Sequence, residues 1–267
     1  MDKKNSRNDQ ALTNSFNKIA DIYDDITNDF THKIIHYIHT QTIVNELPPP
    51  SKSINLLDLG GGTGNYSIIL SKMGYNVTLL DISNKSLEIA RKNIEKENLL
   101  VAIINSSGEN LPIKNETFNI VFMIGGVINY TPNPEKLLRE CKRILTKDGI
   151  LYFDFMNTIG WGNEMLEYNS RLEIIESNTK LIQMEDWDYP VQLFNYKFME
   201  KIIENNGFKI KSKYGLLNVT TSLPLSFRYG KEYNDGILER YKRIELEFSR
   251  DKECYGTSSS CIIVAKK

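Results

Sequence analysis

The sequence contains few residues that could build a covalent or metal-based framework. Its 267 residues include three cysteines, Cys141, Cys254 and Cys261, and no pair of them has C-x-x-C spacing. A sparse, odd-numbered set of this kind argues against both a disulfide framework and a structural zinc site. We therefore expect a fold that is held together by core packing alone.

Long apolar segments are also missing. No run approaches the roughly 20 apolar residues that a membrane-spanning helix needs. The first ten residues are polar, so they do not have the apolar centre of a signal peptide. With 40% hydrophobic and 25% charged residues, the composition is that of an ordinary globular protein, and we expect a cytoplasmic location.

The chain lacks an excess of either charge. Its 33 basic and 34 acidic residues give a formal net charge of −1, so the whole chain offers no electrostatic attraction for nucleic acid. A local basic patch stays open, because Lys209, Lys211 and Lys213 alternate along one expected strand.

Two helices are expected before the rest of the fold. Apolar residues recur at spacings of three and four from Leu12 to Ile26, which predicts one amphipathic helix that includes Tyr23. A second helix is predicted over 31–47, where the three prolines of 48–50 stop it.

After the prolines, short apolar runs alternate with helical patterns. Helices are expected over 65–73, from the N-cap Ser83, from Pro134, and across Phe194 and Phe198 up to Gly207. Alternation of this kind predicts an α/β fold with a doubly wound, seven-stranded, mostly parallel Rossmann-like sheet. The seven expected strands are 54–59, 75–80, 101–104, 118–124, 150–155, 208–214 and 261–265.

Two connections are too long for a minimal fold of this class, which predicts structured lid insertions. We divide the chain into an N-terminal helical cap (1–50), a cofactor-binding core (51–156), a lid insertion (157–192) and a C-terminal part of the sheet (193–267). The last part contains a second insertion at 216–260.

The most informative motif is a glycine-rich turn between an expected strand and an expected helix, Asp58-Leu-Gly-Gly-Gly-Thr-Gly-Asn65. Its glycines allow a tight turn and close approach of a ligand, and the helix N-terminus adds free N–H groups. Asp81 ends the next strand, 21 positions after Gly60. An acid there can accept hydrogen bonds from a ribose diol, although it could instead cap the following helix.

The flanking residues indicate which nucleotide the turn suits. A dinucleotide fingerprint has a third glycine where Asn65 stands, and a carboxylate at Asp58 would repel a pyrophosphate. The charge instead favours S-adenosylmethionine, which carries an ammonium and a sulfonium and no phosphate. An NAD-linked oxidoreductase is therefore disfavoured.

The chain resembles the class I S-adenosylmethionine-dependent methyltransferases, and more narrowly the branch that contains ubiquinone/menaquinone C-methyltransferases and many small-molecule methyltransferases. Four segments carry this resemblance: 56–65, 77–83, 106–112 and 118–148. The resemblance implies S-adenosylmethionine as cofactor. It implies that Gly60 and Gly62 line the methionine part, Asp58 faces the ammonium, Asp81 binds the ribose and Ile82 lies beside the adenine.

Further roles follow from the same resemblance. Ser107 stands where the family usually has an acid that touches the adenine amine, while Gly108 and Glu109 would offer backbone contacts. Ile124 and Gly125 would face the methyl group. Tyr23 either closes over the cofactor, as an aromatic residue often does in this branch, or belongs to the core of its helix.

No catalytic triad is visible, and methyl transfer needs a base only when the acceptor must lose a proton. Weak catalytic candidates are Tyr23, Asn129 and Tyr130; the last two also fit a simple turn before Pro132. His32, His36 and His39 share one helical face, but we expect no metal. Other residues considered for the acceptor are Trp161 and Trp187 as an aromatic lid, and Arg228 with Tyr229 for an acidic acceptor.

The leading hypothesis is an enzyme that methylates a small molecule, a natural product or a peptide. One alternative is an RNA or protein methyltransferase, for which the alternating lysines would provide a basic surface. Another is a regulatory domain that binds S-adenosylmethionine without transferring its methyl group. The segment 124–127 lacks the Asn/Asp-Pro-Pro-aromatic motif of base N-methyltransferases, which lowers the expectation of nucleic-acid base methylation.

Overall fold

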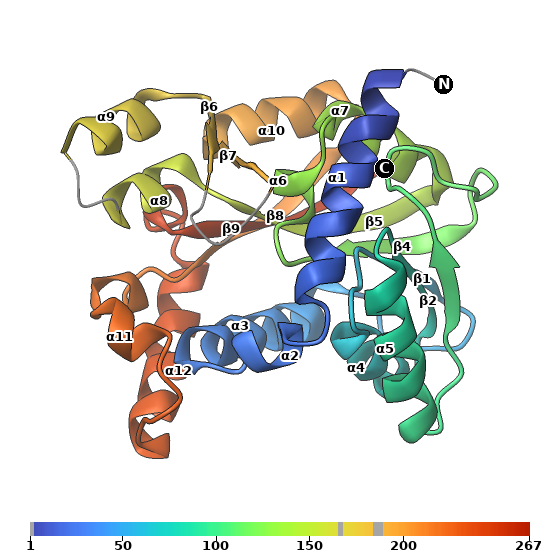
Figure 1. Cartoon of the computed structure of the whole chain (residues 1–267), viewed down its shortest axis with the longest axis horizontal. Helices are drawn as coiled ribbons and strands as arrows, with labels where there is room; N and C mark the ends of the chain where they lie inside the picture. Colours follow the sequence, from blue (N-terminus) through green and yellow to red (C-terminus); the bar gives the residue numbers. More distant parts are fainter. Residues whose placement is uncertain (1–2, 165–167, 184–188) are drawn as a thin grey trace.

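The computed structural model describes residues 3–164, 168–183 and 189–267. Its centre is a seven-stranded sheet with the order β3-β2-β1-β4-β5-β9-β8, in which only β9 runs antiparallel to its neighbours (Figure 1). The predicted doubly wound α/β fold is therefore confirmed. The strands are β1 (Asn55–Leu59), β2 (Asn76–Asp81), β3 (Ala102–Asn105), β4 (Phe118–Met123), β5 (Leu145–Met156), β8 (Lys209–Leu216) and β9 (Ser260–Lys266).

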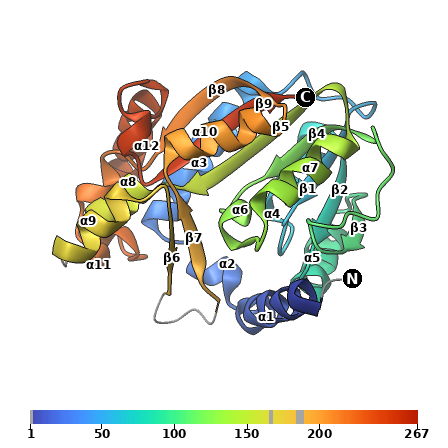
Figure 2. The same ribbon diagram turned by 90° about the horizontal axis from the view of Figure 1, so that it is seen from above.

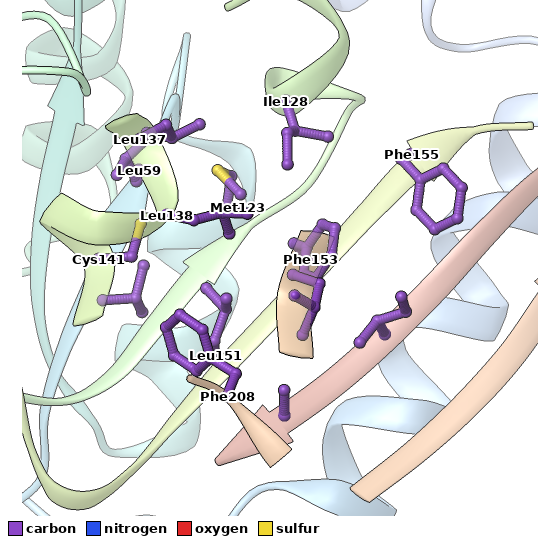
Figure 3. Close-up of a cluster of buried hydrophobic side chains, with 14 of the residues drawn as sticks. Leu59, Met123, Ile128, Leu137, Leu138, Cys141, Leu151, Phe153, Phe155 and Phe208 are labelled. Atoms are coloured by element: carbon purple, nitrogen blue, oxygen red, sulfur yellow. The ribbon is translucent and has the colours of Figure 1, made fainter. Parts of the chain in front are cut away.

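Helices cover both faces of this sheet, so both faces are buried. Successive side chains of a strand point to opposite sides and therefore pack in different layers. In β1, Leu57 packs on the face covered by α7 (Pro134–Ile144) and α10 (Tyr196–Asn205). Its neighbour Leu56 packs on the other face, with α3 (Phe30–Glu46), α4 (Asn65–Met73) and α12 (Asp235–Arg250). Figure 3 shows the first of these cores, with Leu138 and Cys141 of α7 against Met123 and Phe153.

Local sequence signals set several helix ends as expected. Ser83 caps α5 (Asn84–Lys96), where its hydroxyl accepts from the N–H of Ser86 at 3.0 Å. Pro134 stands in the first turn of α7, behind the cap Asn133. The glycine turn ends at α4, which begins at Asn65 as predicted.

The single N-terminal helix expected across 12–26 is wrong. The chain forms α1 (Lys3–Ile19), then a turn, then the short α2 (Tyr23–Ile26). The bend is held from outside, because Asp24 accepts hydrogen bonds from Thr63 at 2.6 Å and Asn65 at 2.9 Å. A tertiary contact with the glycine turn thus overrides the helical periodicity.

The helix expected to include Phe194 is also corrected. Phe194 ends the strand β7 (Val191–Phe194), which pairs antiparallel with β6 (Thr179–Ile182), and Asn195 then caps α10. The remaining helices are α6 (Val127–Tyr130), α8 (Thr158–Glu164), α9 (Tyr168–Glu176) and α11 (Leu225–Arg228), with short 3-10 turns at Thr220–Ser222 and Tyr255–Thr257.

The N-terminal helices lie next to the carboxyl ends of the parallel strands. Helix α1 packs against α5, as Figures 1 and 2 show, while α3 packs against α12. Within the described residues, no helix is both long enough and apolar enough to cross a bilayer.

Candidate active site

Two adjoining cavities open at the carboxyl ends of β1, β2 and β4. The first is lined by the glycine turn, the end of β2, the loop after β3 and one face of α1. Strands of a parallel sheet present their carboxyl ends at one edge, which is where this fold class binds ligands. Its lining includes the predicted residues Tyr23, Gly60, Gly62, Asp81, Ile82, Ser107, Gly108, Ile124 and Gly125.

The glycine turn leaves free space where a ligand would lie. Gly60 and Gly62 have φ values of +77° and +55°, a region that side chains rarely adopt. A Cβ built on Gly62 would meet no protein atom within 4 Å, so this position faces open cavity. A Cβ on Gly60 would come within 2.4 Å of Val127, so packing as well as backbone conformation requires glycine there.

Asp81 is fixed by two backbone groups. One carboxylate oxygen accepts from the N–H of Gly62 at 2.9 Å and the other from Ser83 at 2.8 Å. Burial raises the pKa of Asp81, and the backbone hydrogen bonds oppose that shift. A carboxylate offers about four acceptor positions, so Asp81 keeps acceptor capacity for a ligand in the first cavity.

Asp58 is buried at the end of β1 and lines the second cavity, beside the turn. It accepts from the Ser67 hydroxyl at 2.6 Å. Burial raises its pKa to about 7; the Ser67 hydrogen bond opposes this shift and the nearby charge of Asp81 adds to it. A cationic group placed beside Asp58 would stabilise its ionised form.

The second cavity has a volume of about 1140 Å³ and lies between α2, α3, α4 and the sheet edge. Seven residues line both cavities: Phe16, Tyr23, Gly60, Gly62, Ile124, Gly125 and Tyr130. The Tyr23 hydroxyl lies 3.8 Å from the position that a Cβ of Gly125 would take. Burial, with the charges of Asp81, Asp154 and Asp24, raises the pKa of Tyr23 to about 12, so its hydroxyl stays protonated at neutral pH.

The second cavity also contains a buried carboxylate that the sequence analysis missed. Asp154 of β5 accepts from the N–H of Gly126 at 2.8 Å and pairs with Nε2 of His39 at 3.2 Å. The other ring nitrogen of His39 lies 3.0 Å from the Tyr152 hydroxyl. The available signal was an acid inside the apolar run of β5, a position where a charge is retained only with partners.

Two predicted residues line neither cavity. The Glu109 side chain accepts from Thr131 at 3.0 Å and from the N–H of Asn133 at 2.8 Å. Asn129 accepts from the N–H of Met156 at 3.0 Å and donates to the Gln192 carbonyl at 2.6 Å. These contacts hold the loops beside the cavities, so Asn129 acts through its neighbours rather than by facing an acceptor.

The three histidines do not act as a unit. All three line the second cavity, but His32 pairs with the helix cap Asp29 at 2.8 Å, whereas the rings of His36 and His39 both contact the Tyr66 ring. Across the described part of the chain, no three His, Cys, Asp or Glu side chains are arranged to hold a metal ion.

The aromatic and basic residues considered for the acceptor lie elsewhere. Trp161 packs against a small apolar cluster around Ile174 and Val191. Arg228 and Tyr229 line neither of the two cavities. Trp187 lies outside the described residues.

Comparisons with known proteins agree with this geometry. The methyltransferase domain family matches residues 57–153. An uncharacterized protein of Methanocaldococcus jannaschii is 28% identical over 225 residues, which cover 81% of this chain and 83% of that protein. A ubiquinone/menaquinone biosynthesis C-methyltransferase of Blochmanniella floridana is 34% identical over 150 residues, but these cover only 54% of this chain and 58% of the relative.

Solved structures share the fold over nearly the whole chain. A SAM-dependent methyltransferase of Thermotoga maritima aligns with a TM-score of 0.60 and 20% identity, over 96% of this chain and 99% of that one. A methyltransferase bound to the Trm112 activator of Haloferax volcanii aligns with a TM-score of 0.65 and 15% identity, over 96% of both chains. The matched methyltransferase domain and the methyltransferase relatives, together with the glycine turn and its acids, support an S-adenosylmethionine-dependent methyltransferase with S-adenosylmethionine as the cofactor. The solved structures share its fold.

Proposed function

We propose that this enzyme transfers the methyl group to a small molecule that occupies the second cavity and presents an N–H or O–H group. The observation that carries the proposal is the junction of the two cavities at Tyr23, Gly125 and Tyr130. A donor in the first cavity and an acceptor in the second would meet there, at a place that protein surrounds on several sides. Alignment of this kind lowers the barrier to an in-line displacement.

We place the adenosine part of the cofactor in the first cavity. Asp81 would accept from the ribose hydroxyls, and Gly60 and Gly62 would lie along the methionine part. Asp58 lines the second cavity beside the turn, so the ammonium would reach past Gly60 and Gly62, which line both cavities, to face it. Ile124 and Gly125 would lie beside the methyl group. When bound, S-adenosylmethionine supplies an activated methyl group on a sulfonium.

We place the methyl acceptor in the second cavity. Asp154 has accepted one N–H and one histidine nitrogen, so its remaining lone pairs are available to a donor in the cavity. An acceptor whose N–H or O–H points to Asp154 would turn a lone pair of the same atom toward the junction. Asp154 can then take the proton that this atom loses, and His39 stabilises the carboxylate until it does.

The alternative of an RNA or protein substrate depended on a basic surface formed by Lys209, Lys211 and Lys213, and two of these lysines are in ion pairs. Lys211 pairs with Glu46 and Lys213 with Glu200, each at 2.9 Å. These pairs neutralise two of the three alternating lysines, which leaves little charge to attract phosphates. The second cavity, with a volume of about 1140 Å³, is close in size to the sites that bind small molecules.

The proposal is tested with methyl-labelled S-adenosylmethionine and a cell extract separated into molecules below 1 kDa, protein and RNA. We expect label in the small-molecule fraction, and a rate that is lower by about 100-fold or more for Asp154→Asn, the usual loss for a proton-accepting group. Asp148→Asn is the matched control, because Asp148 is an exposed aspartate of the same strand with φ +62°, which asparagine tolerates. Label confined to protein or RNA would refute the proposal.

A further inference from the structure

Part of the lining of the first cavity comes from α1, a helix that precedes the glycine turn and the other core motifs in the chain. Asp9 lies on α1 and lines the first cavity together with Leu12 and Phe16. Positions i, i+3 and i+7 share one face of a helix, so this face of α1 is turned to the cavity. Leu12 and Phe16 give this part of the cavity wall apolar side chains, and Asp9 adds a carboxylate beside them.

Asp9 lies beside the residue at which the chain departs from its family. Where an acid usually touches the adenine amine, this chain has Ser107, which lines the first cavity together with Asp9. Burial raises the pKa of the Asp9 carboxyl; hydrogen bonding with the Ser107 side chain and the charge of Lys136 oppose the shift. The missing carboxylate is therefore present in the cavity, but it is supplied by a different element.

Helix α1 is positioned for this task by contacts at its other end. Asn17 accepts a hydrogen bond from the Ser83 hydroxyl at 2.7 Å, and Asp21, just after the helix, pairs with Lys85. Both partners belong to the start of α5, directly after Asp81 and Ile82. The same segment that would hold the ribose and adenine thus anchors the helix that carries Asp9.

We propose that Asp9 accepts a hydrogen bond from the 6-amino group of the adenine and so replaces the acid that the family has at the position of Ser107. Ser107 holds the Asp9 carboxylate in place. The other groups near this carboxylate are Lys136, which also lies 4.0 Å from Glu109, and the hydroxyl of Tyr189. As a consequence, selection of adenine depends on the docking of α1.

The Asp9 proposal rests on the proposed function, because it assumes that the adenine lies in the first cavity. A pair of ligands tests the contact of Asp9 with the adenine separately from the binding of the cofactor. S-adenosylhomocysteine has an amino group at position 6 that donates, whereas S-inosylhomocysteine has a carbonyl there that only accepts. A carboxylate favours the first and repels the second. Calorimetric titration of both ligands gives the ratio of their affinities, a readout that does not need the methyl acceptor.

We expect the wild type to prefer S-adenosylhomocysteine by at least tenfold, the usual size of one hydrogen bond to a charged group. Asp9→Asn can turn its amide N–H₂ toward a carbonyl, so the preference should fall at least tenfold, with a gain in absolute affinity for the inosine compound. Asp9→Ala should lose the preference, and Ser107→Asp in the Asp9→Ala background should restore it, because the acid then stands at its usual place.

Asp21→Asn is the matched control. It weakens the docking of α1 through the exposed pair with Lys85, and Asp21 does not line the cavity. If Asp9 acted only by holding α1 in place, both Asp9→Asn and Asp21→Asn would weaken the two ligands equally and leave their ratio unchanged. That result, in a wild type that binds S-adenosylhomocysteine, would overturn the Asp9 proposal alone; a wild type that binds neither ligand would overturn the cofactor site as well.

Discussion

The two cavities differ in how they are built. The first cavity is formed largely by the stretch from the glycine turn to the end of β4, and much of its shape comes from backbone conformation. The second cavity is formed by side chains from segments far apart, such as His39 of α3 and Asp154 of β5, which are 115 positions apart. The residues at a turn largely determine its backbone conformation, whereas a contact between distant side chains depends on the fold of the whole chain. Mutations in the two cavities can test this difference.

The largest effect is expected at the glycine turn. Gly62→Val places a branched side chain in the cavity at φ +55°, so binding of S-adenosylhomocysteine should become undetectable in a calorimetric titration. The strained backbone should also cost about 1–3 kcal/mol of stability. Gly74→Val controls for this strain, because Gly74 has φ +116° at the end of α4 and lines neither cavity. Normal binding to the Gly62 variant would show that the turn does not hold the cofactor.

Asp81→Ala should weaken binding of S-adenosylhomocysteine about 100-fold or more, because two hydrogen bonds to a charged group are lost, each worth about 1.5–3 kcal/mol. The measurement is again calorimetry, with thermal unfolding to confirm that the variant is folded. Asp81 also accepts from Gly62 and Ser83, so a modest loss of stability is expected in addition. Unchanged affinity in a folded variant would rule out the ribose assignment.

In the second cavity, Asp154→Asn should affect methyl transfer to the acceptor without affecting the binding of the cofactor. We expect transfer of the labelled methyl group to the small-molecule acceptor to fall about 100-fold or more, while the affinity for S-adenosylhomocysteine stays within about twofold. The reason is that Asp154 lines the second cavity and not the first. An equal loss of cofactor affinity would mean that the variant disturbs the Gly126 backbone rather than the acceptor.

The smallest effect is a pH dependence that belongs to Asp58. Its pKa of about 7 lies above the value near 4 of an unfolded aspartate, so the ligand-free protein should lose stability as pH rises from about 4 to 7. The ammonium of S-adenosylhomocysteine favours the ionised carboxylate, so affinity should rise with pH and level off above 7. At pH 6 it should be about tenfold below the plateau, since about one-tenth of Asp58 is then ionised. Affinities measured from pH 5.5 to 8.5 check this, and Asp58→Asn should flatten the curve.

The expected elements of the core agree closely with the structure because their signals are local. A buried parallel strand has an apolar run as its sequence pattern. Ser83 and Pro134 mark the starts of two helices, and the helix after the glycine turn begins at Asn65 as predicted. Errors appear where a tertiary contact decides. The stripe from Leu12 to Ile26 is broken because Asp24 binds the glycine turn, and Phe194 joins a strand because β6 pairs with it.

The sequence by itself determined the class of fold, the class of cofactor and the turn at the centre of the site, because glycine conformation and carboxylate charge act at their own positions. Only the tertiary structure decided that α1 covers the first cavity, that Asp9 lies against Ser107, and that Asp154 meets His39. These contacts depend on how helices that carry no strong motif dock on the sheet. That docking is a property of packed surfaces and not of any one segment.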